Sequence, residues 1–207
     1  MSKIKPCFPH LLFIGKQRCG KDLLILHDVF HIIKYGKSIF HPYLQKENLD
    51  FYETSSKIFA NCNLDTNVFS DFYRIKTIED IEKASGPALL WIHDADLWFN
   101  SRNIFMTNKK DNSKLLHLVN NMGKLGLSAR ISCHRRNSLD VKLRQLMNLK
   151  ILPKMVCRSK DRTDFTEWEI HFKVFDEWDM FLGKGRITDI HKIADYYNTE
   201  EVVEELQ

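Results

Sequence analysis

Short hydrophobic runs alternate with stretches of helical periodicity along most of the chain. The runs at 11–14 and 88–92 are uninterrupted, which is typical of strands buried on both faces of a parallel sheet. Further strands are predicted at 57–61, 69–75, 127–133, 150–157 and 168–175, and the second and last of these also fit hairpin arms. Helices are predicted at 23–35, 78–83, 115–125 and 138–147, with Thr77 and Ser138 as caps of the second and last. This order predicts an α/β fold with a mostly parallel sheet flanked by helices.

A glycine-rich segment directly follows the first predicted strand. Gly15, four further residues, Gly20 and Lys21 match the P-loop pattern, and the helix at 23–35 comes next. In this order of elements, backbone N–H groups surround a β-phosphate, the helix N-terminus adds partial positive charge, and the lysine reaches the γ-phosphate. The predicted nucleotide-binding residues are Gly15, Lys16, Gln17, Arg18, Cys19, Gly20, Lys21, Asp22 and Leu23.

Asp22 departs from this pattern, because Ser or Thr ordinarily stands there and ligates Mg²⁺ through its hydroxyl. A carboxylate also binds Mg²⁺ through oxygen, but it brings negative charge close to the triphosphate. Either the metal binds Asp22 directly and neutralises it, or nucleotide binding is weakened.

A second candidate motif closes the hydrophobic run at 88–92. His93, Asp94, Ala95 and Asp96 follow the run directly. A carboxylate at such a strand end holds the Mg²⁺ shell, and a neighbouring acid orients the attacking water. Together with the glycine-rich loop, this motif predicts an ATP site.

Composition places the chain among ordinary globular proteins. Hydrophobic residues make up 43% and charged residues 28% of its 207 residues, and this length fits a single domain covering 1–207. No hydrophobic run approaches the ~18 residues of a membrane span, and we expect no secretion signal at the N-terminus. Five cysteines without a CxxC pair indicate reduced thiols and a cytoplasmic setting.

Charge is distributed unevenly, although the net charge is only +4. Residues 102–162 contain 15 lysines and arginines and three acidic residues, whereas residues 163–207 contain four basic and 12 acidic residues. A basic region of this density favours a polyanionic partner, of which nucleic acid is the first candidate. The alternative is a solvated surface that the acidic C-terminal part partly neutralises.

Three segments resemble motifs of the FtsK/HerA superfamily of P-loop ATPases, and most closely those of its small viral genome-packaging ATPases and Zot-like proteins. The segments are 15–22, 89–99 and 126–135, and the end of the chain at 196–202 is similar to the C-terminal ends of such proteins. The resemblance covers most of the chain and implies a RecA-like P-loop NTPase core.

The resemblance also implies an activity and partners. Such proteins couple ATP hydrolysis to the movement of double-stranded DNA through a ring of subunits, usually into a preformed capsid. ATP and Mg²⁺ are the implied cofactors. Double-stranded DNA, further copies of the chain and a viral capsid or membrane vertex are the implied partners, in the cytoplasm of the host or associated with the virion.

The family pattern allows two assignments at the second motif. In one, His93 takes the metal position and Asp94 the catalytic position; in the other, Asp94 belongs to the metal shell and Asp96 activates water. The family often carries glutamine at the end of the next strand, where it senses the γ-phosphate, and His134 holds that place here. His134 also fits a plain surface histidine. The implied arginine finger of a neighbouring subunit has as candidates Arg130, Arg135, Arg136 and Lys124.

The resulting prediction is an oligomeric ATPase that moves DNA. Its catalytic residues are Lys21, Asp94, Asp96 and His134, and its metal ligands are Asp22 and Asp94. The basic region 102–162 is expected to grip DNA phosphates without sequence preference.

Two alternatives stay open. A catalytically inactive P-loop protein with a DNA-binding or structural role is favoured by Asp22 and His93, both of which depart from the usual motifs. A small nucleotide or phosphometabolite kinase fits the Gly-Lys-Asp sequence and the length.

Overall fold

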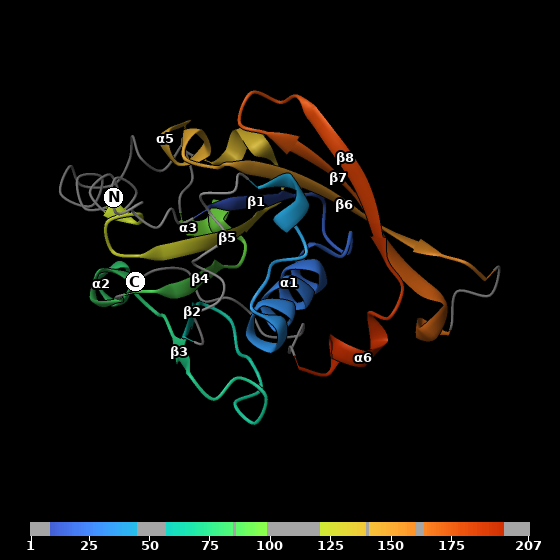
Figure 1. The fold of residues 1–207 in the computed structure, drawn as a ribbon, viewed down its shortest axis with the longest axis horizontal. Helices are drawn as coiled ribbons and strands as arrows, with labels where there is room; N and C mark the ends of the chain where they lie inside the picture. The colour runs from blue at the N-terminus through green and yellow to red at the C-terminus, as the bar shows by residue number, and fades with distance from the viewer. Residues whose placement is uncertain are drawn as a thin grey trace, which may run out of the picture.

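An eight-stranded sheet forms the centre of the computed structural model, which describes residues 9–44, 57–84, 86–98, 121–139, 141–159 and 164–196 (Figure 1). The strand order is β3-β2-β4-β5-β1-β6-β7-β8. The pairs from β3 to β6 are parallel, whereas β7 and β8 are added antiparallel to β6 as a hairpin. The strands are β1 (Leu11–Ile14), β2 (Ile58–Ala60), β3 (Phe72–Arg74), β4 (Ala88–Ile92), β5 (Leu127–Cys133), β6 (Leu149–Cys157), β7 (Trp168–Asp176) and β8 (Phe181–Ile187).

Helices cover both faces of the sheet. They are α1 (Lys21–Tyr35), α2 (Ile78–Lys83), α3 (Ala95–Trp98), α5 (Val141–Gln145) and α6 (His191–Ala194), with short 3-10 helices η1 (His41–Tyr43), η5 (Arg136–Ser138) and η6 (Phe165–Glu167). Leu11 and Phe13 of β1 pack in the same core cluster as α1 and α6, which lie on one side of the sheet (Figure 1). Leu12 packs with α2, α3 and α5 in a second cluster. None of the described helices has the length and hydrophobicity needed to cross a bilayer.

The parallel strands bring three segments to one edge of the sheet. The glycine-rich loop follows β1, His93 follows β4, and His134 follows β5. Strand β5 lies between β1 and β4, so the residues after all three strands meet at the carboxyl edge, where open α/β sheets bind ligands. The fold therefore gathers both sequence motifs in one place.

The predicted elements agree closely with the structure where the pattern is strong. Strands β1, β4 and β5 have the predicted bounds, and α2 begins at the predicted cap. The Thr77 side chain accepts from the Asp80 backbone, and Asp80 accepts in return from the Thr77 backbone, which completes a capping box.

Two predictions need correction, and two lie mostly or entirely outside the described residues. The segment around β3 is parallel to β2 and is not a hairpin arm. Ser138 does not cap a helix; it lies in η5 and its hydroxyl donates to the Arg135 carbonyl. The helix predicted at 115–125 falls mostly outside the described residues, as does the C-terminal segment 197–207.

Strand β8 has no counterpart among the predicted elements. Its sequence contains Gly183 and Gly185, which weaken the strand pattern. Both glycines lie on the face that packs against the core, where a Cβ at 183 would meet Tyr43 and one at 185 would meet Phe172. Glycine occupies these strand positions because the neighbouring aromatic rings leave no room for a Cβ, although glycine has a low strand propensity.

Candidate functional site

The loop between β1 and α1 has the geometry of an anion site. The Gly15 N–H donates to the Cys133 carbonyl at the end of β5, with an N···O distance of 3.1 Å. Gly20, the N-cap of α1, has a φ of 86° and no side-chain capping bond, so the helix N-terminus can receive an anion. A Cβ on Gly20 would also lie 2.8 Å from Met155 Cγ. Both backbone angle and packing therefore require glycine there.

The other predicted nucleotide-binding residues divide into two groups. Lys16, Gln17 and Arg18 are exposed on the outside of the loop. Cys19 fills the space beside Gly15, and burial raises the pKa of its thiol. Leu23, the last residue of the predicted set, packs into the core instead of facing the loop.

Lys21 lies between two carboxylates, with only 4% of its side chain exposed. Its Nζ is 3.4 Å from Oδ1 of Asp94 and 3.8 Å from Oδ2 of Asp22. Burial alone would lower the pKa of Lys21, but the charges of Asp22 and Asp94 outweigh it and raise the pKa. The ammonium is therefore charged and held at the carboxyl edge of the sheet.

The two residues that depart from the usual motifs contact each other. The His93 Nδ1 lies 2.8 Å from the Asp22 Oδ1. Burial opposes the charge on both groups, but their hydrogen bond and mutual attraction outweigh it, lowering the pKa of Asp22 and raising that of His93. The pair is an ion pair when both groups are charged.

Ser132 and Asn61 hold this cluster, and neither was predicted. The Ser132 hydroxyl donates to Asp22 Oδ1 at 3.0 Å and accepts from the Asp94 backbone N–H at 3.0 Å. Asn61 donates to the His93 carbonyl and accepts from its N–H. The available signal was the place of each residue: Asn61 directly follows β2, and Ser132 lies near the end of β5.

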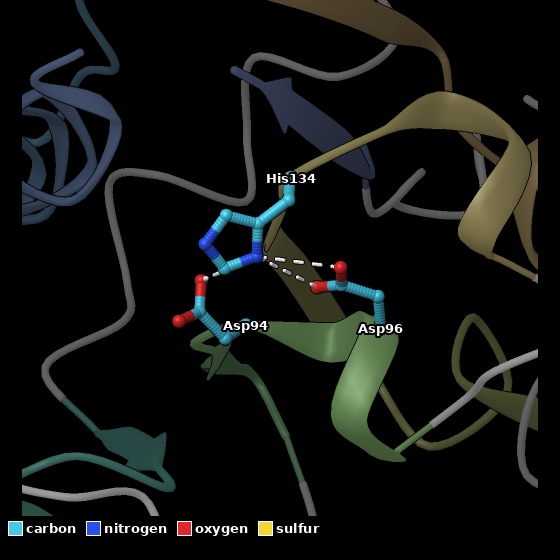
Figure 2. A group of neighbouring side chains, drawn as sticks. All are labelled: Asp94, Asp96 and His134. Carbon is cyan, nitrogen blue, oxygen red and sulfur yellow. Dashed lines mark hydrogen bonds and ion pairs between the residues drawn. The ribbon is translucent and has the colours of Figure 1, made fainter. Parts of the chain in front are cut away.

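His134 faces both acidic residues of the second motif (Figure 2). Its Nδ1 is 3.3 Å and 3.4 Å from the carboxylate oxygens of Asp96 and 3.7 Å from Oδ1 of Asp94. Asp94 has a φ of 46°, a left-handed conformation that turns the chain between β4 and α3. The structure thus brings the four predicted catalytic residues, Lys21, Asp94, Asp96 and His134, into one cluster.

The donor set of this cluster fits a divalent cation. Asp94, Asp96 and His134 each offer a ligand atom within 4.8 Å of the others. Asp94 Oδ1 is buried and accepts no hydrogen bond of good geometry from the described residues, and the Lys21 ammonium lies 3.4 Å from it. Carboxylate oxygens suit Mg²⁺. Asp22 has one oxygen left for a metal, Oδ2, which lies beside Lys21. Its Oδ1 already accepts from Ser132 and contacts His93.

Arg130 is excluded as an arginine finger, which corrects one of the candidates. Its side chain is fully buried and its Nε donates to Oδ2 of Asp28 at 2.9 Å. Asp28 lies on α1 and also accepts from the Ser38 hydroxyl and the Ile39 N–H. Strand β5 directs Arg130 into the protein, so it cannot reach a neighbouring subunit.

The other candidates lie at the surface. Arg135 and Lys124 are exposed, and Arg136 forms an ion pair with Asp179 at 2.7 Å. Among them, Arg135 directly follows His134 and is the nearest in sequence to the cluster.

Comparison with known proteins identifies the fold. No family model and no curated protein matches the sequence. The chain is similar to the N-terminal domain of zonular occludens toxin from Neisseria meningitidis, with 12% identity and a TM-score of 0.55 over 93% of this chain and 100% of that one. It is also similar to B204, the DNA-packaging ATPase from Sulfolobus Turreted Icosahedral Virus, with 16% identity and a TM-score of 0.52 over 84% and 95%. The fold is that of a P-loop NTPase.

The similarity extends to a nucleotide complex of a related protein. The genome packaging NTPase B204 from Sulfolobus turreted icosahedral virus 2, in complex with ATP-γS, matches with 17% identity and a TM-score of 0.50 over 84% of this chain and 95% of that one. The predicted similarity of fold to a Zot-like protein and to a viral genome-packaging ATPase is therefore confirmed. At these identities the similarity establishes the fold alone.

Proposed function

We propose that this P-loop NTPase hydrolyses ATP and uses the reaction to move double-stranded DNA, as a ring of identical subunits that packages a viral genome in the host cytoplasm. The observation that carries the proposal is the 3.4 Å contact between Lys21 Nζ and Asp94 Oδ1. It joins the phosphate-binding loop to the acidic strand end, the two parts that ATP hydrolysis requires. The similarity to a DNA-packaging ATPase supports DNA as the partner.

Each residue of the cluster has its own task in the proposed reaction. Lys21 stabilises the charge of the γ-phosphate, and the N–H groups of the loop bind the β-phosphate. Asp94 belongs to the metal shell in this assignment, and Asp96 together with His134 orients the attacking water. Asp96 holds His134 through Nδ1, and this leaves His134 Nε2, which is buried without a hydrogen-bond partner among the described residues, to accept a hydrogen bond from the attacking water or, when the ring is protonated, to donate one to a phosphate oxygen.

Asp22 and Asp94 are the proposed ligands of Mg²⁺, which when bound neutralises phosphate charge. His93 stands beside Asp22 where the usual motif has an acidic residue. Asp22 therefore supplies the carboxylate that His93 does not, and the contact with His93 lowers the pKa of Asp22 and keeps it ionised.

An inactive nucleotide- or DNA-binding subunit is the second candidate. It is favoured by the contacts of Asp22, whose Oδ1 is engaged by both His93 and Ser132. Such a protein binds ATP without hydrolysing it.

Hydrolysis of ATP with Mg²⁺, with and without duplex DNA, tests the proposal. We expect DNA-stimulated release of phosphate and a loss of about 100-fold in Lys21→Ala, because a principal charge on the phosphates is removed. Lys57→Ala is the matched control, since Lys57 is exposed and precedes β2 at the opposite end of the strands. ATP binding without hydrolysis in the wild type would establish the inactive subunit. Transfer of phosphate to an added nucleoside monophosphate would establish a kinase.

A further inference from the structure

The hairpin at one end of the sheet exposes one of its faces (Figure 1). Ile170, Phe172 and Val174 of β7 point into the core beside α1. Because side chains alternate along a strand, His171 and Lys173 point to the other face, and both are exposed. The same alternation exposes Leu152 and Lys154 on β6, and Lys184 and Arg186 on β8.

Strand pairing places these side chains in two rows across three strands. Lys154 pairs with His171, which pairs with Arg186. Leu152 pairs with Lys173, which pairs with Lys184. Neighbouring strands are about 4.8 Å apart and the rows about 7 Å apart. Lys154, His171, Lys173, Lys184 and Arg186 therefore form one compact patch, the basic sheet face.

The lysines and the arginine of this patch have no carboxylate partner within the described residues. No carboxylate there forms an ion pair with Lys154, Lys173, Lys184 or Arg186. His171 Nε2 lies 3.4 Å from Glu169, but Glu169 also binds Arg158 at 3.0 Å. Like charges directly opposite each other destabilise a sheet, so Lys173 and Lys184 do not stabilise the hairpin by their charges. A polyanion bound to the face would remove this repulsion.

Charge counting along the sequence hides this patch. Four of its five residues belong to the segment 163–207, which has an excess of acidic residues. The acidic residues of the hairpin lie at strand ends and in the turn, at Glu169, Asp176, Glu177 and Asp179, whereas the middle of the exposed face is basic.

We propose that the basic sheet face binds the phosphate backbone of duplex DNA. The inference rests on the proposed function and adds the surface that holds the DNA. Duplex DNA fits because it presents closely spaced phosphates to a surface of long basic side chains in two parallel rows. An anionic membrane fits less well, because the exposed Trp178, Met180 and Phe181 lie at the hairpin end and not among the basic rows.

Binding of a labelled duplex, followed by fluorescence anisotropy over a range of salt concentrations without nucleotide, tests the proposal. One variant combines Lys154→Gln, Lys173→Gln, Lys184→Gln and Arg186→Gln. The control removes the same charge from exposed lysines elsewhere: Lys37→Gln, Lys57→Gln, Lys76→Gln and Lys83→Gln. Each lost phosphate contact lowers the slope of log K against log salt by about 0.9. We therefore expect the slope of the first variant to fall by about 3 to 4 and that of the control to stay near the wild type.

The outcomes separate the two proposals. If the wild type binds the duplex with a steep dependence on salt and the face variant keeps the same dependence, the basic sheet face does not bind DNA. The proposed function would still stand. Absence of duplex binding by the wild type at low salt would overturn DNA as the partner. If the face variant loses the binding of the wild type to vesicles of phosphatidylcholine and phosphatidylserine but retains DNA binding, the face binds a membrane. The face variant should melt at or above the wild-type temperature, because it loses only like-charge repulsion. Its basal ATP hydrolysis should be unchanged and its DNA stimulation lost.

Discussion

Asp22 and His93 each depart from the usual motifs, and in the fold they lie side by side, with 2.8 Å between Nδ1 and Oδ1. The usual site has a hydroxyl on the loop and a carboxylate at the strand end. Here the carboxylate stands on the loop and a neutral or positive imidazole stands at the strand end. The number of carboxylates that the loop and the strand end contribute is therefore kept, although the position of one has changed.

This compensation predicts coupling between the two positions. Asp22→Thr removes the carboxylate beside His93 Nδ1, and His93→Asp places a third carboxylate between Asp22 and Asp94, whose Oδ2 lies 3.3 Å from His93 Nε2. Each change alone should therefore weaken Mg²⁺-dependent binding of an ATP analogue by about tenfold or more. The double variant restores the usual arrangement and should bind at least as well as the wild type. Titration calorimetry of all four proteins measures the cycle. If the loss of affinity in the double variant equals the product of the losses in the two single variants, the two residues act independently.

The buried strand β5 carries polar residues that bind the neighbouring helix α1. All seven of its residues are buried, and its sequence alternates between apolar and polar side chains. Arg130 and Ser132 point to α1, where they bind Asp28 and Asp22. The strand thus holds the helix that begins at the phosphate-binding loop, and this explains how the loop keeps its position relative to β4.

Removing Arg130 should therefore unfold the protein more easily. Arg130→Ala leaves the fully buried carboxylate of Asp28 without its charge partner, and we expect a loss of about 3 to 5 kcal/mol in the free energy of unfolding. Arg135→Ala changes an exposed side chain and should cost about 0.5 kcal/mol or less. Urea denaturation compares the two variants. Equal stability of both would contradict the structural role of Arg130.

A histidine next to β5 should make stability depend on pH. Burial, with a smaller effect from Arg130, lowers the pKa of His10 to about 4, and its Nδ1 accepts from the Ala129 N–H, which requires an unprotonated nitrogen. The full contribution of His10 to stability is present above its ordinary pKa of 6.5, because His10 is then neutral in both the folded and the unfolded chain. As the pH falls from 6.5 towards 4, the unfolded chain takes up a proton and the folded chain does not, so stability falls by on the order of 3 kcal/mol.

His10→Gln keeps an acceptor but does not titrate, and it should flatten this part of the stability profile. Urea denaturation between pH 7 and about pH 4.5 tests the prediction. An unchanged difference between these two conditions in His10→Gln would show that other groups carry the pH dependence.

For the whole molecule, the sequence predicts the α/β class, the parallel sheet and the four clustered catalytic candidates. The fold class is confirmed and the four candidates lie together, because the runs at 11–14 and 88–92 are hydrophobic throughout and the motif residues follow strand ends. The remaining features depend on pairing between distant segments. Asp22 and His93 both depart from the usual motifs in the sequence, but their contact follows only from the order of β4, β5 and β1.

The basic sheet face escapes prediction for the same reason. Lys154 and Arg186 lie far apart in the sequence, and antiparallel pairing through His171 brings them into one row. Strand β8, which carries two of the basic residues, is itself hidden by its glycines. Net charge per segment cannot reveal such a surface, because it does not record which face of a strand each residue occupies.

Displacement of a third DNA strand from a duplex would show whether the protein moves along DNA when it hydrolyses ATP. A translocase that travels along the duplex removes a bound triplex-forming strand without separating the duplex. We expect displacement that requires ATP and Mg²⁺ and that disappears in Lys21→Ala, with Lys57→Ala at the wild-type rate. If the protein hydrolyses ATP and binds the duplex but leaves the third strand in place, it does not move along DNA.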